Sequence, residues 1–589
     1  MATSPRGMRV IGFALAPALS ALLTTTPALA DDDELSINIG GRVQSDLRFR
    51  LERKGFGDYY DRIELPEGPE RNWNTLSVKA DASYSRFKAV AQLDFTLDGF
   101  STELNSVGDL YRIEKVEPYW FQAQALYIDA KSIFLDGLDL RIGQQVVSWG
   151  SGDQFNPTNT LNPDDLRDPL LFGKQAGNFM VKADYWINED WSVTGVMIPV
   201  FQPALLPRSA VLAPAAIDRV PFTDPQLRWR VESETAASKT SILNTPTVIG
   251  SARPTLPEVN FENIQWAYRL AGTLGEQDIA LSYYYGRNDF PVPIANHTRL
   301  DKTPQCDPKD ETKCISGLLK TDATLAYPKM HVYGLNAAGE IPLSWIKEEL
   351  HGIGYRVEAG LYVPDRVEMV LTQDALDLAI PQPAGEYDYD GDGKEGGPRP
   401  ASVDNVAFLK WVVGLDYTFG EHVYVNAQWV HGLVDEYGAG DFLREGWTVR
   451  QSDSTADEGD TVFSCALLKN GERCAREMLH PILGDYIVLG FDFKFLNNAL
   501  LIRLFNILDV SGIVEDRWDE EQEKRVRVHH SPFSEEGFSM VVFPEVNYNF
   551  GNGLDLGAGA LLQLGKDYTK FGDPAAGGST VWTRGKFSF

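Results

Sequence analysis

Hydrophobic and polar residues alternate over long stretches at both ends of the chain. Between residues 35 and 51 every second residue is apolar or small, and the residues between them are polar or charged. Residues 581–589 show the same period. A period of two is that of a β-strand with one apolar face. A membrane-spanning strand needs about 9 to 11 residues, so these segments favour a barrel in a membrane over the alternative, the strands of a soluble sandwich.

Alternating runs recur along the whole chain, and together they predict an all-β fold. We expect a transmembrane antiparallel β-barrel of about 18 strands, with 16 strands as the alternative. The predicted strands span residues 35–51, 75–84, 87–97, 120–129, 138–149, 178–186, 191–201, 262–273, 278–287, 328–337, 352–363, 405–419, 422–433, 485–495, 500–509, 539–550, 554–564 and 579–589.

The connections between these strands alternate between short and long. Tight turns such as residues 85–86, 420–421 and 551–553 are separated by long segments such as residues 202–261 and 434–484. Short periplasmic turns and long extracellular loops are typical of bacterial outer-membrane barrels. The last strand ends on an aromatic residue, so we expect it to pair with the first strand. Phe589 resembles the C-terminal signal that the barrel-assembly machinery recognises.

The first 30 residues differ from the rest of the chain. Arg6 and Arg9 precede an apolar run, and Ala28 and Ala30 are small residues at the offsets of a cleavage site. This pattern indicates a signal peptide over residues 1–30. Residues 31–589 are then a single barrel domain, expected among the lipids of the bacterial outer membrane. No other stretch approaches the 18 apolar residues of a membrane helix.

Charged residues are frequent on the polar face of the predicted strands. Arg or Lys facing lipid near the bilayer midplane would cost about 2 to 4 kcal/mol each, so we expect this face to line a lumen. Two interpretations stay open: an ion-pair network that stiffens the wall, and a wet pore that orients permeants. The expected lumen-lining residues are Arg42, Asp46, Arg48, Arg50, Lys79, Asp81, Lys88, Asp94, Arg141, Lys182, Asp184, Arg269, Lys410, Asp416, Asp492, Lys494, Arg503, Glu545 and Asp555.

The formal net charge is −29. A chain this acidic is a poor ligand for nucleic acid, so no nucleic-acid partner is expected. The excess acid either keeps long surface loops soluble or attracts cations.

One segment after the fifth predicted strand is rich in turn-forming residues. Two Asn-Pro steps force successive turns, because Asn caps its own backbone and Pro fixes φ. We expect this segment to be ordered and to enter the lumen as a constriction; a rigid outer loop is the alternative. The constriction residues would be Trp149, Asp153, Asn156, Pro157, Asn162, Pro163, Asp164 and Asp165.

The Gly-Gln, Trp-Gly, Asn-Pro-Thr and Asn-Pro-Asp pattern of this segment resembles a porin-like outer-membrane family of largely unknown function. The resemblance covers about thirty residues. It implies a barrel that serves traffic of lipids or hydrophobic compounds alongside an inner-membrane transporter of the resistance-nodulation type. No cofactor is required by this interpretation.

Two further motifs lie in the predicted loops. Cys306 with Cys314, and Cys465 with Cys474, are close pairs that we expect to form disulfides in an oxidising compartment; zinc is the alternative. Asp388, Asp390 and Asp392 occupy positions 1, 3 and 5 of a calcium-type loop with Gly393 at position 6. The twelfth position is Arg399 and not the usual Glu, so Ca²⁺ binding competes with an ordinary acidic loop.

The sequence contains no Gly-x-Ser-x-Gly elbow and no His-Glu-x-x-His motif. We therefore expect a channel or transporter for small solutes or hydrophobic molecules, and no enzyme. A loop-plugged barrel that acts as a surface scaffold or export-complex subunit is the alternative, followed by an outer-membrane hydrolase.

Overall fold

The computed structural model describes residues 35–56, 63–99, 106–210, 247–301, 305–307, 310–315, 318–344, 352–375, 392–394, 396–403, 405–439, 477–519 and 524–589. Within these residues, no helix combines the length and hydrophobicity needed to cross a bilayer. The expected signal peptide and the pair Cys465 and Cys474 lie outside the described residues.

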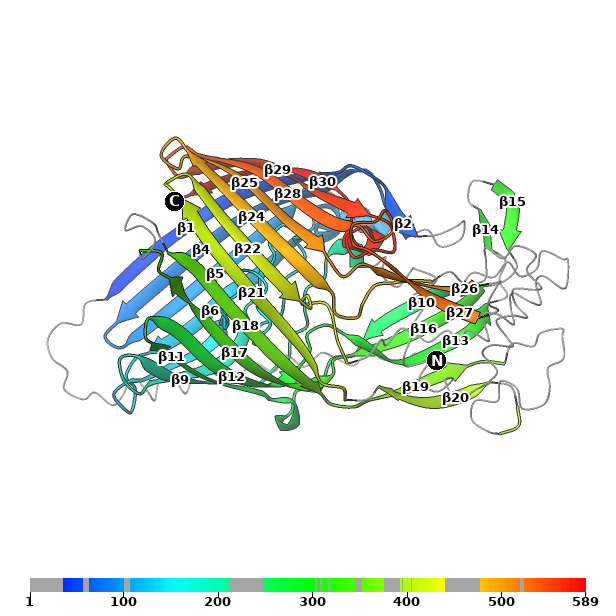
Figure 1. Cartoon of the computed structure of the whole chain (residues 1–589), viewed down its shortest axis with the longest axis horizontal. Coiled ribbons are helices and arrows are strands. Elements are labelled where there is room, and N and C mark those ends of the chain that lie inside the picture. The colour runs from blue at the N-terminus through cyan, green and yellow to red at the C-terminus, as the bar shows by residue number, and fades with distance from the viewer. Residues whose placement is uncertain are drawn as a thin grey trace.

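Eighteen antiparallel strands form one closed barrel (Figure 1). All eighteen predicted strands are present, so the predicted fold is confirmed. In order around the barrel they are β1 (Ser36–Arg50), β4 (Gly68–Tyr84), β5 (Phe87–Asp98), β6 (Tyr119–Ala130), β7 (Leu138–Gln145), β8 (Asn178–Trp186), β9 (Trp191–Ile198), β11 (Gln265–Leu274), β12 (Gln277–Arg287), β17 (Lys329–Ile341), β18 (Ile353–Pro364), β21 (Phe408–Phe419), β22 (Val423–His431), β24 (Asp485–Phe495), β25 (Leu500–Asp509), β28 (Ser539–Asn549), β29 (Leu554–Gly565) and β30 (Thr580–Ser588).

The barrel closes between its first and last strands, as the alternation predicted. The register of β1 with β30 runs from Arg42 opposite Ser588 to Arg50 opposite Thr580. One residue further, Gly41 and Phe589 exchange two backbone hydrogen bonds of 2.9 Å each. The chain end therefore lies in the closing pair of strands.

The two faces of the wall differ in polarity. On β1, Ile39 and Val43 are exposed on the outer face, 72% and 50%, whereas Asp46 and Arg48 are 2% exposed on the inner face. The other strands continue this outer apolar surface. An apolar outer face around a closed antiparallel barrel is the architecture of an outer-membrane protein.

The long loops at the end opposite the short turns contain strands, which were not predicted from the sequence. Five strands form a separate sheet at that end (Figure 1): β10 (Thr247–Pro254), β16 (Leu318–Ala326), β13 (Val292–Asp301), β19 (Val367–Gln373) and β20 (Gly397–Val403). The smaller sheets pair β2 (Lys54–Phe56) with β3 (Ile63–Leu65), β14 (Gln305–Asp307) with β15 (Asp310–Ile315), and β23 (Glu477–Leu479) with β26 (Ile513–Asp519) and β27 (Lys524–His530).

These outer strands were not predicted because their sequences lack the long alternation of the wall strands. The short helices of the described residues are η1 (Val107–Tyr111), α2 (Ile113–Val116), η4 (Phe261–Asn263) and η6 (Pro574–Ala576).

Several predicted strand ends were wrong, and two of them lie at the ends of β7 and β9. β7 was expected to reach residue 149 but ends at Gln145, and β9 was expected to reach residue 201 but ends at Ile198. In both cases alternation continues for a few residues after the chain has left the hydrogen-bonded wall. Strands β7, β8 and β9 have 8, 9 and 8 residues, and the chain turns into the lumen after Gln145.

Candidate functional site

Residues 146–177, which we call the lumen loop, leave the wall at the end of β7 and rejoin it at the start of β8. Asn162 holds the two feet of the loop together. Its side-chain oxygen accepts from the Val147 amide at 2.8 Å, and its amide nitrogen donates to the carbonyls of Gln145 at 2.8 Å and Ala176 at 3.0 Å. The first Asn-Pro step of the motif therefore forms turns. Asn162 of the second step joins the two ends of the lumen loop.

A second amide pair orders the loop interior. Asn159 accepts from the Trp149 amide at 2.9 Å and donates to the Gln175 side chain at 3.0 Å. Gln175 in turn donates to the Asn159 carbonyl at 3.0 Å. Because these buried donors and acceptors satisfy one another, the loop holds one conformation without regular secondary structure.

Glu358, on β18, is the main polar anchor of the lumen loop on the wall. Its carboxylate is fully buried. It accepts from the amides of Ser151 at 2.8 Å and Gly152 at 2.9 Å. It also accepts from the amide of Thr158 at 2.8 Å and the hydroxyl of Thr158 at 2.7 Å. Four donors around one carboxylate make a strong charge-assisted contact between loop and wall.

Asp153 makes a neighbouring contact with β22. Its side chain accepts from Asn426 at 3.2 Å, and its backbone carbonyl accepts from Gln428 at 3.1 Å. Arg356, on β18, lies 3.8 Å from the Asp153 carboxylate. Tyr362, also on β18, donates to the Pro157 carbonyl at 2.5 Å.

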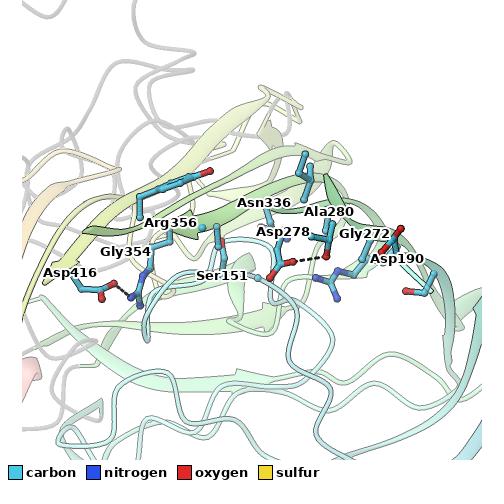
Figure 2. A pocket seen from close by; sticks show the side chains of 18 of the residues that line it. Ser151, Asp190, Gly272, Asp278, Ala280, Asn336, Gly354, Arg356 and Asp416 are labelled. Atoms are coloured by element: carbon cyan, nitrogen blue, oxygen red, sulfur yellow. Dashed lines mark hydrogen bonds and ion pairs between the residues drawn. The ribbon is translucent and has the colours of Figure 1, made fainter. Parts of the chain in front are cut away.

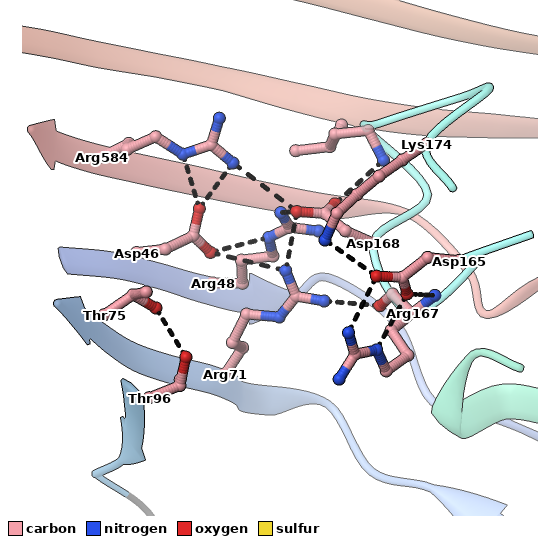
Figure 3. Close-up of polar contacts among 11 residues, drawn as sticks. Asp46, Arg48, Arg71, Thr75, Thr96, Asp165, Arg167, Asp168, Lys174 and Arg584 are labelled. Carbon is pink, nitrogen blue, oxygen red and sulfur yellow. Dashed lines mark hydrogen bonds and ion pairs between the residues drawn. The ribbon is translucent and has the colours of Figure 1, made fainter. Parts of the chain in front are cut away.

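The opposite side of the lumen loop is held by an ionic cluster (Figure 3). Asp168 accepts from Arg48 of β1 at 2.6 Å and from Arg71 of β4 at 2.9 Å. Asp46 bridges Arg48 at 3.0 Å and Arg584 of β30 at 2.7 Å. Burial alone would raise the pKa of Asp168, but the charges of Arg48 and Arg71 outweigh it and hold that pKa well below its ordinary value.

Asp165 lies beside this cluster, as Figure 3 shows. It pairs with Arg167 and Lys174 of the same loop, each at 2.8 Å. Arg167 also donates to the side chain of Gln122, on β6, at 2.7 Å. The loop therefore contacts strands on both sides of the barrel through polar groups.

Apolar contacts complete the attachment of the lumen loop. Trp149 and Leu161 belong to a buried cluster whose wall residues come from β8, β9, β11, β12, β17, β18 and β21. Phe155 belongs to a second cluster with wall residues from β21 to β29, and Phe172 packs against it. Phe172 lies 5.4 Å from Phe543 in an edge-to-face arrangement. The loop is thus attached to the inner wall by two apolar clusters as well as by polar contacts.

A carboxyl pair joins the lumen loop to two neighbouring outer segments. The Asp164 amide donates to the side chain of Asp289 at 2.9 Å, and the Leu205 amide donates to the Asp164 carbonyl at 2.8 Å. Burial raises the pKa of Asp289 to about 6. Burial and the nearby Asp289 charge raise the pKa of Asp164 well above its ordinary value.

A polar cavity lies between the lumen loop and the short-turn end of the barrel (Figure 2). Its volume is about 580 Å³, and Gly150 and Ser151 of the loop form part of its lining. Arg356 pairs with Asp416 in it, and the Thr273 hydroxyl donates to Asp278 at 2.9 Å. Arg269 also lines the cavity, and its Nε has no hydrogen-bond partner among the described residues.

Many of the wall residues predicted from the alternation pair with an opposite charge. These pairs include Lys88 with Asp81 at 3.4 Å, Arg141 with Asp129 at 3.0 Å, Lys182 with Asp184, Arg503 with Asp492 at 2.7 Å, Lys586 with Asp555 at 2.9 Å, and Arg50 with Glu70 at 2.7 Å.

The remaining predicted wall residues have other surroundings. Lys410 is buried and donates to the Leu433 carbonyl at 2.6 Å. Ser77 donates to Asp94, and Asn547 donates to Glu545. Arg42 and Lys79 are exposed, and Lys494 is half-buried. Ion pairs therefore connect neighbouring strands in part of the wall, and a stiffening effect of these pairs stays a prediction.

Several anchoring residues were absent from the predicted site. Arg71 was missed because its strand was expected to begin at residue 75, whereas β4 begins at Gly68. Glu358 stands on the inner row of its strand, and alternation with Val357 and Ala359 was the signal that could have found it. Asp168 carries no such signal, because its role depends on where the loop lies in the lumen.

The structure describes only part of the cysteine pairs and of the calcium-type loop. Strands β14 and β15 place Cys306 directly opposite Cys314 in register, and the disulfide stays a prediction. Asp388 and Asp390 lie outside the described residues. Asp392 is exposed and accepts from the Lys394 amide at 2.9 Å. Among the described residues, no group of three His, Cys, Asp or Glu side chains is arranged to hold a metal ion.

Comparisons with known proteins add structural neighbours and nothing more specific. No family model matches the sequence, and no curated protein matches it. Among solved structures, OccAB3 of Acinetobacter baumannii is 8% identical, with 94% of this chain and 99% of that chain covered and a TM-score of 0.41. OccK5 (OpdH) of Pseudomonas aeruginosa is 9% identical, with 94% and 97% covered and a TM-score of 0.38. OmpT, an outer membrane protein of Vibrio cholerae, is 7% identical, with 96% and 100% covered and a TM-score of 0.34. At these identities and TM-scores, we derive the function from this chain's own residues.

Proposed function

We propose that this protein is an outer-membrane channel whose lumen loop controls the passage of solutes. The observation that carries the proposal is the attachment of the loop to both sides of the lumen, by Glu358 on one side and by Arg48 and Arg71 on the other. A polar cavity lies directly beneath it. A segment placed across a lumen at this level is where a barrel of 18 strands can restrict flow.

We propose two classes of transported molecule. The cavity at the short-turn end is polar and suits small hydrated solutes. The two apolar clusters between the loop and the inner wall favour hydrophobic or lipid-like molecules. The family resemblance of the loop motif supports the second class and an inner-membrane exporter as the partner. We also propose that the barrel-assembly machinery recognises Phe589.

Planar-bilayer recording tests the channel. We expect the wild-type protein to give discrete conductance steps, and the variant Glu358→Gln to increase the open fraction on the order of tenfold. Hydrogen bonds to a charged group are worth about 1.5 to 3 kcal/mol, and the amide loses that charge. Glu340→Gln is the matched control, because Glu340 is exposed on the neighbouring strand β17 and does not touch the loop anchor.

A second function is favoured by the two apolar clusters. They pack the lumen loop against most of the wall, as expected of a plugged barrel that serves as a scaffold or export-complex subunit. Bilayers that stay silent with folded wild-type protein and folded Glu358→Gln would support the scaffold and overturn the channel. Conductance steps of equal size and frequency in the wild type, Glu358→Gln and Glu340→Gln would show that the lumen loop does not control conduction.

A further inference from the structure

The wall of the barrel is incomplete beside the lumen loop. β6 pairs with β5 from Tyr119 to Ala130. Its pairing with β7 covers residues Leu126 to Ala130 and stops there, within a part of the chain (residues 106–210) that is described throughout. The outer half of β6 therefore has a strand neighbour on one side, and a bulge at Gln124 marks the change.

The gap is closed by a side chain and not by a ladder of backbone hydrogen bonds. Gln144 lies on the outer row of β7, and its amide nitrogen donates to the carbonyl of Ala123 at 2.9 Å and to the carbonyl of Gly177 at 3.0 Å. Gly177 lies so close to β6 that a Cβ added there would be 2.4 Å from the Gln124 carbonyl. We call this junction of β6 with Gln144 and Gly177 the seam.

A polar junction of this kind is unusual on the outer face of a membrane barrel. Unsatisfied backbone groups cost several kcal/mol in hydrocarbon, so the carbonyls at the end of a ladder need a donor. Gln144 supplies it, and the large residues around the seam are apolar and exposed: Phe121 is 63% exposed, and Phe179 and Val146 are each 39% exposed.

The inner side of the same junction is apolar where it borders β8 and β9. Val147 follows Gln144 by three residues and is buried in the first apolar cluster. Met180 of β8 and Val196 of β9 belong to that cluster and face the lumen. Apolar surface therefore lies outside the wall and, on the β8 side of the seam, inside it, whereas Gln122 and Gln124 line the inner face of β6 and bind Arg167 and Asp94.

The seam is joined to the lumen loop through the loop's own feet. Asn162 binds the carbonyls of Gln145 and Ala176, and each of these residues is the chain neighbour of a seam residue. A displacement of the loop that breaks the Asn162 contacts therefore also loosens Gln144 and Gly177.

We propose that the seam is a lateral portal between the lumen and the hydrocarbon of the membrane, used by single-chain apolar amphiphiles. The proposal rests on the proposed function, since it assigns a route and a ligand class to the same lumen loop. An alkyl chain entering between Phe121 and Phe179 displaces Gln144 from the Ala123 carbonyl and meets Met180 and Val196 behind it. The solute never crosses the outer loops in this route.

Photolabelling of the wild-type protein tests the portal. The protein is reconstituted in vesicles of dioleoylphosphatidylcholine with a trace of palmitic acid that carries a diazirine near its chain end, and the adducts are mapped by mass spectrometry. We expect adducts on the lipid-facing residues Phe121 and Phe179 and also on the luminal residues Met180 and Val196. Val541 is a buried luminal residue on β28 and belongs to the second cluster, so it should stay unlabelled.

A variant pair sharpens the test. Gln144→Leu keeps the size of the side chain and removes both hydrogen bonds, so labelling of Met180 and Val196 should rise about fivefold. Ser45→Ala is the control, because Ser45 donates to Asn74 at 2.8 Å on the outer face where β1 and β4 are fully paired. Its labelling pattern should match that of the wild type.

Adducts confined to lipid-facing residues would overturn the portal, and so would equal labelling of Val196 and Val541. The wild-type map decides the question if Gln144→Leu does not fold. Conductance steps that respond to Glu358→Gln together with a purely lipid-facing map would remove the portal and keep the channel. A silent bilayer together with luminal adducts would remove the channel and keep the portal.

Discussion

At the scale of single residues, the lumen is organised by carboxylates that each hold several donors. Asp46 and Arg48 could be placed inside the barrel from the alternation of β1, because one apolar face fixes the direction of the other. Their partner Asp168 could not be assigned in advance. It is 120 residues from Arg48 in sequence, and a loop without periodicity does not reveal which wall it meets.

Asp168→Asn tests the energetic weight of the ionic cluster. The variant removes one of the two carboxylates that Arg48 and Arg71 share, Asp46 being the other, and removal of one partner from a buried ion pair costs about 3 to 5 kcal/mol. We expect a loss of that size in the free energy of unfolding, measured by urea denaturation of the folded barrel in detergent micelles.

Asp492→Asn is the matched control. Asp492 pairs with Arg503 on the inner wall, but the Arg503 side chain is 43% exposed. Exposed pairs contribute about 0.2 to 1 kcal/mol, so this variant should change the stability much less. Equal losses in the two variants would show that the cluster around Asp168 has no special weight.

At the scale of elements, the lumen loop shows what periodicity does and does not determine. The strands on either side of it were located to within four residues, because the alternation of the wall is long. The turn chemistry of its Asn-Pro steps indicated order but not direction, since a rigid loop can lie outside or inside. Its path follows from anchors on distant strands, such as Glu358 on β18, and these are properties of the assembled barrel.

The carboxyl pair Asp164 and Asp289 predicts that docking of the loop depends on pH. The pKa of Asp289 is raised to about 6 from an ordinary 3.8, so the docked state binds more protons than the undocked state between these values. Docking therefore strengthens as the pH falls through about 6. The pKa of Asp168 is lowered, and its contribution is lost only at more acidic pH.

In bilayer recordings, the open fraction should fall when the pH is lowered from about 7.5 to about 5. Asp289→Asn removes the group whose pKa is about 6 and should weaken this response between the same two pH values. An open fraction that rises on acidification, or a variant that keeps the full response, would contradict the assignment to Asp289.

At the scale of the whole molecule, closure of the barrel could be predicted because both ends of the chain show the same alternation. The outer sheet of β10, β16, β13, β19 and β20 could not, since its strands pair across long loops and include parallel pairs. Such pairings leave no local pattern in the sequence. The wall is thus encoded locally, and the structure outside the membrane is encoded by contacts between loops.

Deletion of Phe589 tests the closure. The two backbone hydrogen bonds between Gly41 and Phe589 would be lost at the end of the closing pair, together with an exposed aromatic residue. We expect a severalfold smaller fraction of folded barrel in outer membranes, measured by heat-modifiable migration. Phe550→Ala removes another exposed aromatic at the same end and should leave that fraction near the wild-type value. Equal fractions in the two variants would argue against a special role for the chain end.

The register of β7 with β8 ends with Gln145 opposite Asn178, so the lumen loop begins and ends at one rung of the wall. A segment attached in this way can rotate about the residue pair Gln145 and Asn178, but it cannot move along the barrel axis. Release of the contacts between the loop and Glu358 would leave the attachment at Gln145 and Asn178 in place. The loop could then return to the same closed position after each opening.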